Sequence, residues 1–232
     1  MSLVARRASA SPADRAYVRA ALPRGRTPWR EAGFCVVDLE TTGLDPRRDE
    51  IVSFAALAVQ GGRVQLESVV QRLVRPQRAV SVESVRIHGL RQADLETAPS
   101  LDDVLDELLR ALTGRVLVAH AVWIERAFLR PVLRRHGIRL RRPAVDTSLL
   151  GRLWLQLRDG ESPRHIGLAD LCEAVGVPSH RPHTATGDAL SAAQAFLALA
   201  TKLEAEGPET VASLARADQR LEQERLYPRH NS

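Results

Sequence analysis

The first half of the chain contains three apolar runs with the length and composition of β-strands. They cover residues 34–39, 50–60 and 63–74. The Gly61-Gly62 pair between the second and third runs is typical of a tight hairpin. The pattern therefore predicts three consecutive strands, the last two of which form a hairpin.

From residue 100 onwards the hydrophobic spacing is that of helices interrupted by short strands. Ser100, with Asp103 three residues later, fits the capping box of a helix that continues to residue 112. Later helices are predicted over residues 123–136, from after 146 to 157, and over 168–175, 189–203 and 209–226. Pro131 lies inside the first of these and should kink that helix. Short strands are predicted over residues 115–119 and 145–146. This order indicates an α/β fold in which parallel strands follow an antiparallel meander.

The two ends of the chain differ from its middle. Residues 1–30 hold seven arginines and one acid, with no strand or amphipathic pattern, and predict a flexible basic arm. Such an arm either follows a phosphate backbone or is a disordered leader. Residues 31–204 are expected to form the catalytic domain, and residues 205–232 a helical C-terminal tail.

Composition narrows the class of protein. Hydrophobic residues make up 44% of the 232, yet no apolar run approaches the ~20 residues of a membrane span. Cys35 and Cys172 lie in apolar segments, which favours buried thiols in a reducing cytoplasm over a disulfide framework. The formal net charge of +5 favours a polyanionic partner. Lys202 is the only lysine, and G+C-rich codon usage is sufficient to produce such an excess of arginine over lysine. A solvated basic surface therefore explains the charge equally well.

The first candidate chemistry lies at the end of the first predicted strand. Alternate residues of a strand share a face, so Asp38 and Glu40 project together. Two carboxylates at the end of a buried strand repel each other and are costly to desolvate. A hard dication with oxygen ligands removes both problems. An acid-x-acid pair is common, so the prediction of a metal site depends on the apolar strand before it and the Thr-Thr-Gly turn after it.

Two more segments carry candidate residues. His183 lies in a loop-like stretch five residues before Asp188, where a general base has freedom to move. Asp188 opens the predicted helix and equally fits an ordinary helix start. Glu125 lies near the start of another helix, which is commonplace on its own. His180 and His183 have a possible zinc spacing, but no cysteine or other partner completes such a site.

Taken together and in this order, the three segments resemble the motifs of the DEDDh (DnaQ-like) family of 3′–5′ exonucleases. The family includes the proofreading subunit of bacterial replicative polymerase, ribonuclease T and oligoribonuclease. The resemblance spans residues 34–199, and the first and third segments match the family's pattern closely. The middle segment departs from it, because Ala121, Ile124 and Glu125 stand where the family usually has Asn, an aromatic residue and Asp.

The resemblance implies an RNase H-like fold, with a mixed five-stranded sheet of a meander plus parallel strands, flanked by helices. It also implies two Mg²⁺ ions, with Mn²⁺ as a substitute. The metal ligands implied are Asp38, Glu40, Asp188 and Glu125, and His183 is the implied base. The residues implied to bind substrate are Thr41, Thr42, Leu44 and His120.

The implied activity is hydrolysis from the 3′ end of DNA or RNA to nucleoside 5′-monophosphates, in replication proofreading or repair. Two alternatives stay open. One is a catalytically weakened module that binds 3′ ends or a polymerase complex, for which Glu125 is the only support; the other is RNA trimming. Gln223, Leu226 and Tyr227 faintly resemble peptides that dock on a sliding clamp, although a frayed helix end explains them as well.

Overall fold

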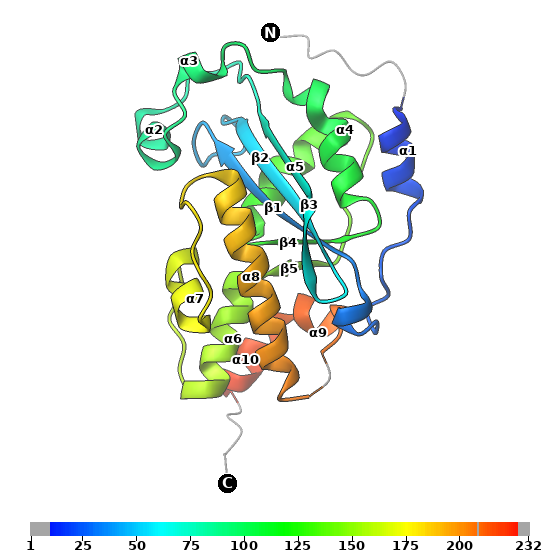
Figure 1. The fold of residues 1–232 in the computed structure, drawn as a ribbon, viewed down its shortest axis with the longest axis vertical. Coiled ribbons are helices and arrows are strands. Elements are labelled where there is room, and N and C mark those ends of the chain that lie inside the picture. The colour runs from blue at the N-terminus through cyan, green and yellow to red at the C-terminus, as the bar shows by residue number, and fades with distance from the viewer. Residues whose placement is uncertain (1–9, 208, 227–232) are drawn as a thin grey trace.

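The computed structural model describes residues 10–207 and 209–226, built around one five-stranded sheet. The strands are β1 (Phe34–Thr41), β2 (Ile51–Gln60), β3 (Arg63–Leu73), β4 (Val116–Ala119) and β5 (Ala144–Asp146). Their order is β3-β2-β1-β4-β5, with β1 to β3 antiparallel and β4 and β5 parallel to β1 (Figure 1). The predicted RNase H-like sheet is confirmed.

The composition of each strand matches its place in the sheet. Every residue of β2 except Gln60 is buried, as its continuous apolar run predicts. β3 lies at the edge and is largely exposed. Gly61 and Gly62, with φ of 61° and 68°, form the two-residue turn between these strands. The predicted hairpin is confirmed, and glycine tolerates this turn because it requires positive φ at both positions.

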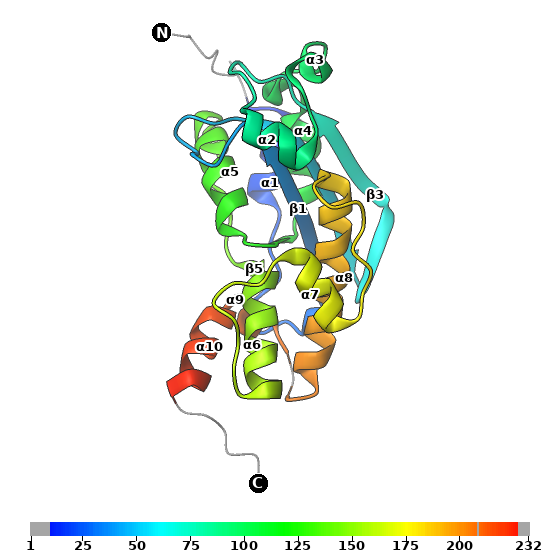
Figure 2. The same cartoon turned by 90° about the vertical axis from the view of Figure 1, so that its left-hand side faces the viewer.

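Helices cover both faces of the sheet and divide the core in two. α8 (Ala185–Glu204), α6 (Thr147–Asp159) and α7 (Leu168–Val175) pack on one face. α4 (Leu101–Leu112) and α5 (Trp123–Arg135) pack on the other, so that β1 runs between α5 and α8 (Figure 2). The side chains of β1 alternate between the two cores.

Most predicted helices are present with boundaries shifted by a few residues. α8 begins at Ala185, four residues before the predicted start, because Thr184 caps it. α2 (Val82–His88) and α3 (Gln92–Leu95) were not predicted. Within the described ranges, no helix has both the length and the apolar character to cross a membrane.

The prediction of a flexible basic arm is wrong for residues 10–30. α1 (Pro12–Arg19) buries Ala13 and Tyr17 against α4 (Figure 1). The short 3₁₀ helix η1 (Trp29–Glu31) places Trp29 in the core under α8. The arginines of these elements are exposed to solvent. Because they outnumber the few buried apolar residues, the amphipathic pattern is not evident from the sequence. Residues 1–9 lie outside the described part.

The C-terminal segment is helical, as predicted, but it packs on the domain. α9 (Val211–Ala215) and α10 (Ala217–Leu226) bury Val211, Leu214, Ala217 and Leu221 in the core under α8, and α10 lies beside α6 (Figure 1). Backbone hydrogen bonds, such as that from Val211 N to Thr27 O (3.0 Å), join this segment to the N-terminal one. In the suggested clamp-docking peptide, Gln223 is exposed on α10, whereas Tyr227 lies outside the described residues.

Candidate active site

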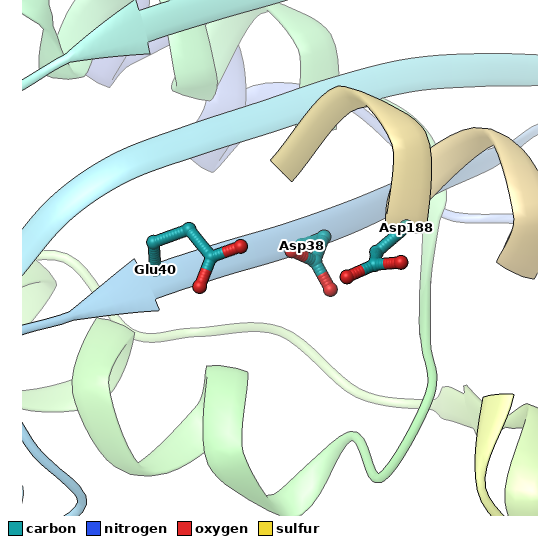
Figure 3. Close-up of side chains that lie close together, drawn as sticks. All are labelled: Asp38, Glu40 and Asp188. Carbon is teal, nitrogen blue, oxygen red and sulfur yellow. The ribbon is translucent and has the colours of Figure 1, made fainter. Parts of the chain in front are cut away.

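Three carboxylates meet between β1 and the start of α8. Asp38 and Glu40 share one face of β1, as the alternation predicted, and this face, which also carries Phe34 and Val36, is turned toward α8. Asp188 approaches them from the first turn of that helix. Carboxylate oxygens of the three residues all lie within 4.8 Å of one another, and Figure 3 shows them turned toward a common space.

Asp188 does not cap α8. The N-cap is Thr184, whose hydroxyl accepts a hydrogen bond from Gly187 N at 3.2 Å. Asp188 Oδ2 instead accepts the backbone N–H of His183 at 2.9 Å. An ordinary capping role therefore does not account for Asp188, and its carboxylate ties the loop of His183 to the acidic cluster.

His183 lies in the loop before α8, as predicted, and its side chain is exposed. This loop lies directly on the helix: a Cβ on Gly187 would overlap the carbonyl oxygens of His180 and Arg181. Only glycine permits so close an approach, a requirement that the sequence alone did not reveal. His180 Nε2 lies 3.1 Å from Gln194 Oε1, and His180 is absent from the candidate metal ligands among the described residues.

Glu125 is buried at the third residue of α5 and lies outside the group of three. Its Oε2 atom is buried and has no hydrogen-bond partner within the described part of the chain. After burial itself, the charge of Glu125 is the strongest influence that raises the pKa of Asp38. These two carboxylates therefore lie near each other, and a buried oxygen without a partner is a suitable ligand for a cation.

Burial and mutual repulsion disfavour the charged forms of these acids. The pKa of Asp38 is raised well above its usual value by burial and then by Glu125, Glu40 and Asp188. Burial and then Asp188 raise the pKa of Glu40 to about 7. Every neighbour that acts on these two groups raises their pKa. The excess negative charge fits a hard divalent cation, which prefers carboxylate oxygens.

An exonuclease family model matches residues 35–196, more than half of the chain. The chain belongs to this exonuclease family. It is 36% identical over 187 residues to the DNA polymerase III subunit epsilon-like protein of Rhodobacter capsulatus, covering 79% of this chain and 26% of that protein. It is 33% identical over 201 residues to the PolC-type DNA polymerase III of Thermotoga maritima, covering 86% of this chain and 14% of that protein.

The fold supports the same assignment. The nuclease domain of 3′hExo, described as a DEDDh family member bound to rAMP, superposes with a TM-score of 0.59 at 18% identity, covering 77% of this chain and 94% of that one. The resemblance to the DEDDh exonucleases is thus confirmed. The chain spans about a quarter or less of the length of the two polymerase-related proteins.

The turn after β1 is held together by its own threonines. Thr41 Oγ1 donates to Gly43 O at 2.6 Å, and Thr42 Oγ1 donates to Asp49 Oδ1 at 3.0 Å. Leu44, in contrast, is 71% exposed. Of the substrate-binding residues predicted in this turn, Leu44 has a largely exposed side chain, whereas the two threonine hydroxyls form hydrogen bonds within the turn.

His120 and Asp146 form hydrogen bonds with the segments next to the acidic cluster. The ring nitrogens of His120 lie 3.0 Å from Thr147 Oγ1 and 3.1 Å from Ile166 O, so both have partners within the domain, and the substrate role of this residue stays a prediction. Asp146 accepts the backbone N–H groups of Ala121 and Val122 at 3.1 and 3.0 Å. It thereby fixes the turn that leads to Glu125, a role that sequence reasoning missed.

Ala121 occupies a left-handed backbone conformation, with φ of 59°. Asn tolerates this region better than Ala. We therefore expect Ala121→Asn to raise the free energy of unfolding by about 0.5–1 kcal/mol, measured by urea unfolding in EDTA. Ala79→Asn, at an exposed loop position without positive φ, is the matched control and should leave stability unchanged. Equal effects of the two substitutions would contradict this account.

The raised pKa of Glu40 predicts a stability that falls with pH. Between 4.5 and about 7 the folded exonuclease holds a proton that the unfolded chain releases, so its stability declines across that window. This group alone accounts for about 3 kcal/mol. Without metal, the melting temperature should therefore fall from about pH 5 to about pH 8.

Because the cation binds the charged carboxylates, Mg²⁺ should raise the melting temperature far more at the higher pH. Differential scanning fluorimetry with EDTA and with Mg²⁺ at both pH values measures this difference, and Glu40→Gln should reduce it. A metal-induced shift that is the same at both pH values, or the same in the variant, would count against the assignment.

Proposed function

We propose that the chain is a divalent-metal-dependent 3′–5′ exonuclease that releases nucleoside 5′-monophosphates from single-stranded DNA, with RNA as the alternative substrate. The observation that carries this proposal is the acidic cluster of Asp38, Glu40 and Asp188, in which Glu40 is buried and both aspartates are partly buried, with Glu125 beside it. The match to the exonuclease family supports it, as do the DNA polymerase names of its relatives.

The carboxylates divide naturally between two cations. Asp38, Glu40 and Asp188 would hold one, and Asp38 and Glu125 would hold the second. Since all the ligand atoms are carboxylate oxygens, Mg²⁺ is the ion proposed, with Mn²⁺ as a substitute. Bound cations supply positive charge beside the phosphate under attack and the oxygen that leaves it.

The remaining steps use residues of the chain itself. As the oxygen of a water molecule bonds to phosphorus, His183 accepts its proton, and the bond from phosphorus to the 3′-oxygen of the preceding nucleotide breaks. The exposed His183 ring is suited to this role, and its backbone bond to Asp188 keeps the loop beside the cluster. Leu44 would pack against the terminal nucleotide.

The direct test incubates the protein with 3′-labelled and 5′-labelled single-stranded DNA and RNA in Mg²⁺, Mn²⁺ or EDTA. We expect stepwise shortening from the 3′ end in either metal and none in EDTA. Faster loss of DNA than of RNA supports proofreading or repair, and the reverse favours RNA trimming. Binding of both strands without shortening in any metal would overturn the enzyme assignment in favour of an accessory module.

We also propose that the protein works in the cytoplasm with a DNA polymerase or its sliding clamp. Cys35 and Cys172 are buried free thiols, which suits a reducing compartment. Both polymerase-related proteins contain a segment similar to this chain within a much longer protein. Co-purification of purified polymerase subunits with the tagged chain, and its loss on removal of residues 223–232, would test this partnership.

A further inference from the structure

We propose that the outer side of α5 binds the phosphodiester backbone of the nucleic-acid strand whose 3′ end occupies the acidic cluster. This inference rests on the proposed function. The surface, here called the α5 stripe, consists of Trp123, Arg126, Arg130 and Arg134, together with Arg139 from the loop after the helix and Arg142 just before β5.

Helical spacing places the first four of these residues in one row. Arg126, Arg130 and Arg134 follow one another at four-residue steps, about 6 Å apart along the helix axis. Trp123 lies three residues before the first of them and is 62% exposed. The opposite side of α5 is buried against the sheet (Figure 2). The row thus starts two residues before Glu125 and leads away from the active site along solvent-facing helix.

The arginines of the stripe are close together and lack counter-charges. A hollow of about 460 Å³ is lined by Arg130, Arg134, Arg139 and Arg142 and by no acid. None of the five arginines of the stripe forms an ion pair with a residue that the structure describes. Burial and the charges of Arg130 and Arg142 lower the pKa of Arg126.

Like charges at four-residue steps destabilise a helix, so an anion that bridges them removes a cost already present in the free protein. A second hollow, of about 520 Å³, shares Arg134 and lies between the second half of α5 and the segments that follow β1 and β3. Its lining includes Arg47, Arg75, Arg78 and Arg135 along with three acids, so the positive surface extends further but is partly compensated there.

This combination suits a single strand of nucleic acid. Such strands bind where a positive surface follows the backbone and an exposed aromatic side chain offers a face on which a base stacks. Arginine forks match phosphate oxygens in geometry as well as in charge. Trp123 lies at the end of the stripe next to the acidic cluster, where the last bases before the 3′ end would pass, and the arginines follow in the 5′ direction of the strand.

The double variant Arg130→Gln/Arg134→Gln tests the arginines. Its control, Arg26→Gln/Arg63→Gln, removes the same charge from exposed positions at the other end of the sheet. Binding of a fluorescent single-stranded 20-mer is measured in EDTA at several salt concentrations. Loss of two phosphate contacts should weaken binding about 25-fold at about 0.1 M salt and reduce by about 1.4 the slope of log K against log salt concentration.

Trp123→Ala tests the stacking of a base on the exposed indole. It should weaken binding about tenfold without changing that slope.

Cleavage by the same variants separates this inference from the proposed function. The double variant should raise KM for the 20-mer and leave dinucleotide cleavage unchanged, because a dinucleotide does not reach the stripe. A hairpin with a short 3′ overhang shows whether the affected backbone belongs to the degraded strand or to its complement. If the parent cleaves but the double variant behaves like its control with every substrate, the stripe is a solvated surface and the inference fails. If the parent cleaves nothing, the proposed function fails first.

Discussion

Asp38→Asn is expected to lower kcat by at least about 10³-fold and, in the same protein, to raise the melting temperature measured in EDTA. The activity falls because Asp38 is the carboxylate that both cation sites share in the proposed arrangement. Loss of a shared cation ligand removes several kcal/mol of transition-state stabilisation, and each 1.36 kcal/mol corresponds to a factor of ten in rate. The stability rises because an amide in place of this partly buried acid removes its repulsion with Glu125, Glu40 and Asp188.

The opposite signs of these two effects make the prediction specific. A residue that only supports the fold would lose activity and stability together. Asp170→Asn, on an exposed position of α7, makes the same chemical change and should alter neither quantity. Single-turnover cleavage of a 3′-labelled strand in Mg²⁺ and thermal unfolding in EDTA measure the two effects. A stable variant that keeps its rate would remove Asp38 from the chemistry.

The sequence was sufficient to predict features that depend on short-range periodicity. The two-residue period of a strand fixes Asp38 and Glu40 on one face whatever surrounds them. The Gly61-Gly62 turn is local for the same reason. Features that depend on distant parts of the chain were not predictable in this way. The fit of Gly187 against the carbonyl oxygens of His180 and Arg181 is set by how a whole loop folds onto α8.

The folded N-terminal segment shows a second limit of sequence reasoning. In α1, Ala13 and Tyr17 are the anchoring apolar residues, and the partner that buries them, α4, lies about ninety residues away. Arg141, still further along the chain, donates to the carbonyl oxygens of Tyr17 and Ala20. An arginine-rich composition describes only the solvent side of such a segment. For His120, the family resemblance implied a substrate-binding role, and the partners of its two ring nitrogens, Thr147 and Ile166, became known only from the fold.

Substitutions of Glu125 are expected to have the second largest effect on activity. At this position the chain has Glu where its family usually has Asp. Glu125→Gln keeps the size of the side chain and removes its charge, and we expect kcat to fall by about 10²–10³-fold in Mg²⁺. Glu125→Asp keeps the charge but withdraws the oxygens by about 1.5 Å. It should cost about tenfold in kcat and require more Mg²⁺ for half-maximal rate, because a small misplacement of a ligand weakens a metal site.

The comparison of these two variants decides what the longer side chain does. Glu125 is buried, its Oε2 lacks a partner among the described residues, and its carboxylate accepts a hydrogen bond from its own backbone N–H, so its position is set by the start of α5. If Glu125→Asp cleaves faster than the parent, the glutamate weakens the enzyme, and an accessory role gains support. If Glu125→Gln cleaves as fast as the parent, the second cation site is misassigned. Mg²⁺ titrations of the initial rate distinguish all three results, because substitution of a cation ligand changes both the maximal rate and the metal concentration needed to reach it.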